Sequence, residues 1–278
     1  MLPATLAGRP EVSSMPGRLE TMARRIRGIL FDLGDTLLDF GTVDVPSVFE
    51  SGARRAHEYL TGQSFRLPSL AKYHRRQLWA IRWNYLKSKF TRREFNALDL
   101  LGRLSARLGH RLSREQALEL AWRWYEPLSR QATVEDALAG TLLRLSRAGL
   151  KLGLVSNTFV PGEVLDRHLT EIGLLDLLPV RIYSCQVRYR KPSPVIFRLA
   201  LERAGLAAGE TMFVGDSLQA DIRGANNVGM VSVLKDPAGR HVEDKGGAMH
   251  RVAKLAELEE LVAGYNGAAG GVRQTASR

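Results

Sequence analysis

In the stretch Gly28-Ile29-Leu30-Phe31-Asp32-Leu33, a short apolar run is followed by the acidic side chain of Asp32. Such a run is typical of a buried parallel strand that delivers a polar side chain at its carboxyl end. Similar runs recur at 152–156, 181–184, 211–216 and 230–234, and amphipathic helical patterns lie between them at about 135–148, 162–172, 194–204 and 218–228. This alternation predicts an α/β fold with a doubly wound, Rossmann-like parallel sheet and helices on both of its faces.

Residues 45–131 have a different composition from the rest of the chain. They carry 17 basic and 7 acidic side chains, which accounts for nearly all of the net charge of +11, and they contain all four tryptophans. Helical periodicity recurs at about 46–61, 68–90, 92–108 and 113–130, and Ser113-Arg114-Glu115-Gln116 forms a capping box. We therefore expect an α-helical cap domain, inserted between the first strand and the remainder of the sheet.

The tryptophans of this segment fall into two pairs. Trp79 and Trp83 are four residues apart on one predicted helix, and this spacing favours core packing over stacking on a substrate. Trp122 and Trp124 are two residues apart and cannot share a helix face, so we expect one of them to be exposed or to lie in a groove.

The domain boundaries follow from these patterns. We assign residues 25–44 and 132–263 to the α/β core and residues 45–131 to the cap. Residues 1–24 mix Pro, Gly, Ser and Arg without a periodic apolar pattern, which predicts a disordered extension. Residues 264–278 are rich in Gly and Ala, which predicts a flexible tail.

Cysteine content and hydropathy indicate the compartment. The lone Cys185 excludes an internal disulfide framework and a multi-cysteine zinc site. No apolar run approaches the ~20 residues that a membrane span requires, and the N-terminal region lacks the apolar stretch of a signal peptide. We therefore expect a cytoplasmic protein with no membrane segment.

Four polar clusters follow the predicted strands: 32–38, 156–158, Lys191-Pro192 and 215–221. Because ligands bind at the carboxyl ends of parallel strands, we expect these clusters to form one site. They supply a leading carboxylate, a hydroxyl beside an amide, an ammonium group and a later carboxylate pair. Phosphoryl transfer needs these groups, namely a carboxylate nucleophile, donors around the transferring oxygens and oxygen ligands for Mg²⁺.

The four clusters, in this order, resemble the motifs of the haloacid dehalogenase-like hydrolase superfamily over about residues 26–262. The inserted helical segment resembles the C1-type cap of that family. The resemblance implies that Asp32 is the nucleophile and that Lys191 offsets charge between the nucleophile and the phosphate. It further implies a phosphate-binding set that consists of Thr36, Ser156, Asn157 and Lys191. In this set Ser156 and Asn157 would lie beside the phosphoryl oxygens, and Thr36 would steady the first loop.

The same resemblance implies a bound cofactor, Mg²⁺. Its protein ligands would be Asp32, the backbone carbonyl of Gly34, and Asp216, with Asp221 supporting the metal waters or Lys191.

One position departs from the pattern of the family's phosphatases. They carry a second Asp two residues after the nucleophile, which protonates the leaving alcohol and later activates water, but this chain has Gly34 there. General acid–base help is worth about 10²–10⁴-fold in rate, so its loss favours substrates with better leaving groups or the use of a water. Asp35 would point to the other side if the chain stays extended, and would substitute only if the loop turns.

These observations favour a Mg²⁺-dependent phosphatase that hydrolyses a small phosphorylated metabolite through an aspartyl-phosphate. One alternative is a hydrolytic 2-haloacid dehalogenase, whose branch lacks the same acid but does not need the metal carboxylate that Gly215-Asp216 retains. Another alternative, motivated by the charge and the aromatic residues of the cap, is a low-activity protein that binds a nucleotide or nucleic acid. The sequence favours nucleic acid less than a small phosphorylated metabolite as a partner, and it does not decide the oligomeric state.

Overall fold

The computed structural model describes residues 25–91, 93–239 and 247–271. The described residues form a six-stranded sheet in which every neighbouring pair of strands is parallel, with the order β3-β2-β1-β4-β5-β6. Its strands are β1 (Gly28–Phe31), β2 (Lys151–Ser156), β3 (Val180–Tyr183), β4 (Thr211–Gly215), β5 (Val231–Lys235) and β6 (His250–Val252). The first five coincide with the predicted runs, whereas β6, a three-residue edge strand, was not predicted.

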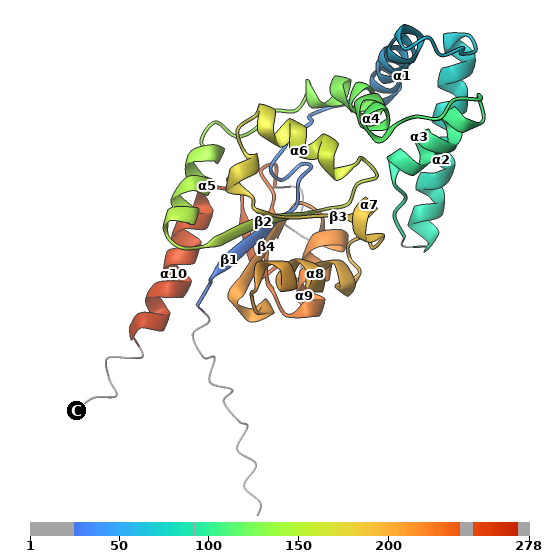
Figure 1. Ribbon diagram of the computed structural model, residues 1–278. Helices are drawn as coiled ribbons and strands as arrows, with labels where there is room; N and C mark the ends of the chain where they lie inside the picture. Colours follow the sequence, from blue (N-terminus) through green and yellow to red (C-terminus); the bar gives the residue numbers. More distant parts are fainter. Residues whose placement is uncertain (1–24, 92, 240–246, 272–278) are drawn as a thin grey trace, which may run out of the picture.

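Helices cover both faces of the sheet (Figure 1). One face carries α5 (Leu138–Arg147), α6 (Gly162–Glu171) and α10 (Glu257–Gly271), and the other carries α8 (Pro194–Ala204) and α9 (Arg223–Val228). Along β1 the side chains alternate, because Ile29 and Phe31 pack with the first set of helices while Leu30 packs with the second. The doubly wound α/β architecture predicted from the sequence is therefore confirmed.

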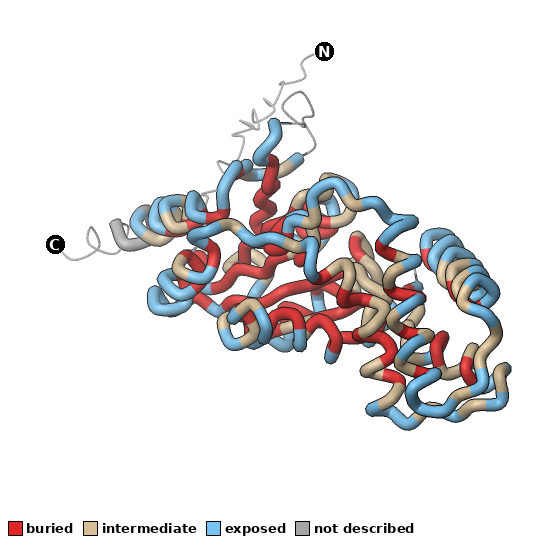
Figure 2. The backbone as a smooth tube through the Cα atoms, turned by 90° about the horizontal axis from the view of Figure 1, so that it is seen from above, coloured by how far each residue is buried: buried red, intermediate tan, exposed pale blue. Residues whose placement is uncertain are grey.

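Short turns complete the core. They are the one-turn helix α7 (Ser184–Val187), two 3₁₀ turns (Leu175–Leu177 and Ala208–Glu210) and a π-helical turn at Leu218–Ile222. Buried residues are concentrated in the sheet and along the helix faces that cover it (Figure 2).

The inserted cap is helical, as expected. Its helices are α1 (Val45–Gly62), α2 (Leu70–Thr91), α3 (Ala97–Ala106) and α4 (Arg114–Ser129). The predicted capping box begins α4, since the Ser113 hydroxyl accepts from the Gln116 backbone N–H at 3.2 Å and the Gln116 side chain accepts from the Ser113 N–H at 2.9 Å. A Cβ atom added at Gly52 would lie 2.6 Å from the backbone oxygen of Trp124, so a glycine allows α1 to pack closely against α4.

The prediction for Trp79 and Trp83 was wrong. Their side chains are 69% and 60% exposed, and their rings stack on each other with centroids 6.4 Å apart. Among the residues of α2, all of them described, only Tyr73, Gln77 and Ser88 are buried. The two tryptophans instead line an open cavity of about 810 Å³ between α2 and α3. Spacing identified their shared face but not whether another element covers it.

The second tryptophan pair follows the expectation more closely. Trp122 is buried and stacks under the Arg167 guanidinium at 3.9 Å, while Trp124 is half-buried and lines a small cavity of about 110 Å³.

The two ends of the chain differ from the predicted boundaries in one respect. Residues 1–24 and 272–278 lie outside the described residues. However, α10 continues to Gly271, beyond residue 263, where we placed the end of the core. Tyr265 contacts His250 at 2.6 Å and Asn266 accepts from the Ile26 N–H at 2.8 Å, so the first part of the predicted tail packs on the core. No helix in the described part of the chain is long and apolar enough to cross a membrane.

Candidate active site

The register of the sheet brings Asp32 to the centre of its carboxyl edge. Phe31, the last residue of β1, pairs with Leu154 of β2 on one side and Val214 of β4 on the other. Because Ser156 and Asp216 each lie two residues beyond those partners, they flank Asp32. All three residues line one cleft of about 560 Å³ between the sheet edge and the cap.

The chain turns sharply after Asp32. The backbone N–H of Asp35 donates to the oxygen of Leu38 at 2.6 Å, and that of Leu37 donates to Leu33 at 2.9 Å. Asp35 adopts a left-handed backbone conformation with φ of 57°. The chain is therefore not extended here, and Asp35 lies exposed on the wall of the cleft.

Lys191 lies at the centre of the site. Its Nζ forms ion pairs with Asp32 and, at 2.7 Å, with Asp221, and its side chain is only 2% exposed. The side chain of Asn157 accepts from the Lys191 backbone N–H at 2.7 Å and donates to its carbonyl oxygen at 3.0 Å. Both side-chain polar atoms of Asn157 thus fix the Lys191 backbone, which gives this side chain a positioning role, while the phosphate contact implied for Asn157 stays a prediction.

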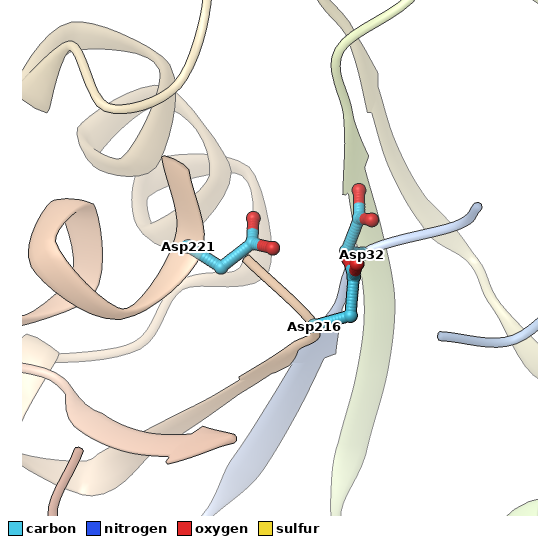
Figure 3. Close-up of side chains that lie close together, drawn as sticks. All are labelled: Asp32, Asp216 and Asp221. Carbon is cyan, nitrogen blue, oxygen red and sulfur yellow. The ribbon is translucent and has the colours of Figure 1, made fainter. Parts of the chain in front are cut away.

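Three carboxylates converge beside this ammonium group. Asp32, Asp216 and Asp221 each offer an oxygen, and these atoms lie within 4.8 Å of one another (Figure 3). Asp221 lies in the π-helical turn after β4, and its Oδ2 accepts a hydrogen bond from the Ser217 N–H at 3.0 Å. A Cβ atom at Gly215 would lie 2.4 Å from the Asp221 carboxyl carbon, so a glycine is needed for Asp221 to fold back against the strand.

Burial governs the acid–base properties of the cluster. It raises the pKa of Asp32 to about 7, although Lys191 opposes this shift, and it raises the pKa of Asp216 to about 6, with Asp221 and Asp35 adding to the effect. Burial by itself would lower the pKa of Lys191, but the charges of Asp221 and Asp32 raise it above its ordinary value. Lys191 therefore carries a positive charge, and the three carboxylates favour the binding of a second cation beside it.

The donor set fits a divalent cation. Mg²⁺ prefers oxygen ligands and is held by few carboxylates. Asp32 and Asp216 present carboxylate oxygens at the cleft wall, and Gly34, whose backbone carbonyl is the third expected ligand, lines the same wall. Asp221, which is committed to Lys191 and the Ser217 N–H, contributes its charge at a short distance.

Thr36 is the predicted site residue that the structure does not bring to the cleft. It is fully buried, it is absent from the cleft wall, and its backbone oxygen accepts from Lys235 Nζ at 2.7 Å. This position suits support of the loop after Asp32 and does not fit the phosphate contact predicted for Thr36.

Sequence reasoning missed the side of the cleft that faces the cap. Its wall includes Phe40, Tyr125, Phe159, Glu94 and Arg190. Glu94 precedes α3 and forms an ion pair with Arg190, the residue before Lys191. Phe159 and Arg190 each adjoin a predicted cluster, which was the available signal, whereas nothing local marks Glu94 or Tyr125.

Comparison with known proteins agrees with this geometry. The model of the haloacid dehalogenase-like hydrolase family matches residues 26–229. The chain is 33% identical to a ribulose-1,5-bisphosphate 5-phosphatase of Halopiger xanaduensis over 148 residues, which are 50% of this chain and 60% of that protein. The chain therefore belongs to the haloacid dehalogenase-like hydrolases.

Solved structures share the fold over most of this chain. The crystal structure of a HAD phosphatase from Thermococcus onnurineus is 26% identical, with a TM-score of 0.58 over 86% of this chain and 99% of that one. A 2-haloacid dehalogenase from Pseudomonas syringae has a TM-score of 0.60 over the same shares at 22% identity, and this likeness shows the fold alone. For five curated relatives, the matched stretches span only 39% to 60% of their length.

Proposed function

We propose that the protein is a Mg²⁺-dependent phosphatase that hydrolyses a small phosphomonoester through an aspartyl-phosphate on Asp32. One observation carries the proposal: Asp32 lies at the edge of the sheet in contact with the Lys191 ammonium and within 4.8 Å of the carboxylates of Asp216 and Asp221. A carboxylate so placed attacks phosphorus in line, while the lysine and a cation offset the negative charge of the transferring group.

The remaining roles follow from position. Ser156, buried at the end of β2 on the cleft wall, donates its hydroxyl to a phosphoryl oxygen. Asp32, Gly34 and Asp216 would hold Mg²⁺, with Asp221 beside them, and the ion would neutralise charge on the phosphoryl oxygens. The cap, residues 45–131, covers the cleft, excludes bulk water and selects the leaving group. The cytoplasmic location stays a prediction.

The phosphatase proposal is tested with a panel of phosphorylated metabolites, assayed with Mg²⁺ and with EDTA, for the natural protein and for Asp32→Asn. We expect phosphate release that needs Mg²⁺ and falls at least about 10³-fold in the variant. Activity that survives the substitution would place the attacking group elsewhere. Chloride release from a 2-haloacid in EDTA would instead identify the dehalogenase alternative.

A second function, binding of single-stranded nucleic acid, is favoured by the exposed tryptophans of α2. Trp79 and Trp83 line the 810 Å³ cavity together with Arg76, Arg103 and Arg107, and the sequence of α2 contains no acidic residue. Aromatic rings beside guanidinium groups stack bases and pair with phosphates. Fluorescence anisotropy with labelled oligouridylate should show salt-sensitive binding that Trp79→Ala with Trp83→Ala abolishes. Binding that ignores these substitutions, or none at low salt, would exclude this function.

A further inference from the structure

The cleft above Asp32 has a polar floor and an apolar wall. The floor consists of the carboxylates, Lys191 and Ser156, whereas the wall toward the cap includes Phe40, Tyr125 and Phe159, joined by Leu128 and Val160. A volume of about 560 Å³ exceeds what a phosphoryl group needs and accommodates a ring beside it. The leaving group therefore meets mainly aromatic and aliphatic carbon on this wall, with the Glu94–Arg190 ion pair beside it.

Two polar side chains on that wall, Tyr125 and Glu94, already have partners within the protein. The Tyr125 hydroxyl contacts His168 Nδ1 at 2.9 Å, and the Glu94 carboxylate pairs with Arg190 and lies 3.1 Å from the Ser184 hydroxyl. Binding a polyhydroxylated leaving group would leave its hydroxyls without partners among these side chains, which is costly once water is excluded. A planar apolar leaving group has no such cost.

Protonation of the leaving group is the second constraint. Gly34 offers no side chain where the related phosphatases place their acid. Asp221 is committed to Lys191 and to the Ser217 N–H, and Glu94 is committed to Arg190. Asp35 lies on the wall of the same cleft, one residue further along the chain. Its side chain is exposed, however, and no hydrogen bond or ion pair from another described residue holds its carboxylate in place against a leaving group.

Leaving groups differ widely in their need for an acid. A phenol ionises with a pKa of about 10, as the tyrosine side chain does, so it departs as a stable anion, whereas an alkyl alcohol is a far poorer anion. A positioned acid contributes about 10²–10⁴-fold to rate, and this factor is missing for an alkyl ester in this cleft.

Building on the phosphatase proposed above, we infer that the substrates of this site are aryl phosphates, the phosphate monoesters of phenols or of comparably acidic planar hydroxyl compounds. The Asp32 carboxylate oxygen forms a bond to phosphorus as the bond from phosphorus to the aryl oxygen breaks, and the phenolate leaves and takes a proton from water. Water then attacks the phosphorus of the aspartyl-phosphate, which releases inorganic phosphate and restores the Asp32 carboxylate. The sum is one ester and one water converted to a phenol and phosphate.

Phenyl phosphate and benzyl phosphate form a matched pair, since both carry the same ring and only the benzyl ester has an alkyl leaving group. With Mg²⁺ present, kcat/KM for phenyl phosphate should exceed that for benzyl phosphate by at least about 10²-fold. Benzyl phosphate should in turn be a better substrate than glycerol 3-phosphate, because only its ring fits the wall. Phe159→Ala should raise KM for phenyl phosphate.

Two variants test whether the missing acid causes the expected preference for phenyl phosphate over benzyl phosphate. Gly34→Asp should raise kcat/KM for benzyl phosphate at least about 10-fold with a smaller effect on phenyl phosphate; a Cβ there meets only the Phe40 ring, at an ordinary contact of 3.5 Å. Asp35→Asn should leave the phenyl-to-benzyl ratio unchanged.

The contrary outcomes are distinct. If the natural protein hydrolyses phenyl and benzyl phosphate within threefold of each other, or if Asp35→Asn selectively loses benzyl phosphate, an acid acts in the cleft and the inference is wrong while the phosphatase stands. A preference for glycerol 3-phosphate over benzyl phosphate overturns the inference that the apolar wall of the cleft binds an aromatic ring. Failure to hydrolyse any ester with Mg²⁺ removes the proposed function itself.

Discussion

Glu94 of the cap and Arg190 of the core form an ion pair in which the glutamate side chain is fully buried and the arginine side chain is only 17% exposed. Arg190 directly precedes Lys191, and its guanidinium also lies over the Tyr85 ring of α2. The pair thus joins the segment between α2 and α3 to the loop that carries the central lysine. Burial raises the pKa of Glu94 even though Arg190 opposes the shift.

Arg190→Met should destabilise the protein, because it leaves the Glu94 carboxylate buried without its cation. Removing one partner of a buried pair costs about 3–5 kcal/mol, so we expect the melting temperature measured by calorimetry to fall by about 5 °C or more. The matched control is Arg188→Met, whose ion pair with Asp99 at 3.2 Å is exposed on both sides and is worth about 1 kcal/mol or less. Equal losses for the two variants would contradict the structural importance of the buried pair.

Gly215→Ala should damage the site without unfolding the protein. The added methyl group would collide with the Asp221 carboxyl group and displace it from Lys191. We expect both Mg²⁺ affinity and kcat to fall at least about 10-fold, as for other losses of residues around a metal. Gly209→Ala is the control, since a Cβ there meets nothing within 4 Å; if both variants keep full Mg²⁺ affinity, Gly215 has no such role.

Mg²⁺ binding should strengthen as the pH rises. Asp32 and Asp216, with pKa values raised to about 7 and about 6, must lose their protons before they can ligate the ion. Isothermal titration calorimetry should therefore give an affinity at least about tenfold weaker at pH 5.5 than at pH 8, with proton release detected from two buffers of different ionisation enthalpy. A dissociation constant that does not change with pH would refute the predicted protonation of the cluster.

Asp32→Asn should stabilise the metal-free protein at high pH. The folded-state pKa of Asp32, about 7, lies above its value of about 3.9 in an unfolded chain, so its contribution to stability is full below pH 4 and is lost as the pH rises through 7. In EDTA, the variant should melt about 2–5 °C above the natural protein at pH 8 and close to it at pH 5. The exposed Asp35→Asn serves as control, and an equal shift at both pH values would contradict the sign of this linkage.

Local patterns were sufficient for the core of the fold. Apolar runs of four to six residues marked β1 to β5, because strands buried on both faces need continuous apolar sequence, and four of these runs lead to a polar side chain. The edge strand β6 was missed because only Val252 of its three residues is buried, so it carries no such run. The helical extent of α10 was missed for a related reason, since the contacts that hold Tyr265 and Asn266 are made with distant parts of the chain.

The prediction of the site was limited in the same way, because contacts between residues distant in the sequence leave no local pattern. The order of the clusters placed Asp32, Ser156, Lys191 and Asp216 on one cleft wall, because the carboxyl ends of parallel strands meet at one edge. Sequence did not reveal that Asn157 binds the Lys191 backbone, since that contact joins residues 34 positions apart. Trp79 and Trp83 failed as core predictions because periodicity describes a helix face and not what covers it.

Chemical trapping on Asp32 tests the central claim most directly. The protein is mixed with Mg²⁺ and phenyl phosphate, quenched during turnover and reduced with borohydride, which converts an aspartyl-phosphate to homoserine. Peptide mass spectrometry should find homoserine at position 32 and unmodified aspartate at positions 35, 216 and 221. Turnover that leaves aspartate 32 unmodified, or that marks another carboxylate, would contradict the account.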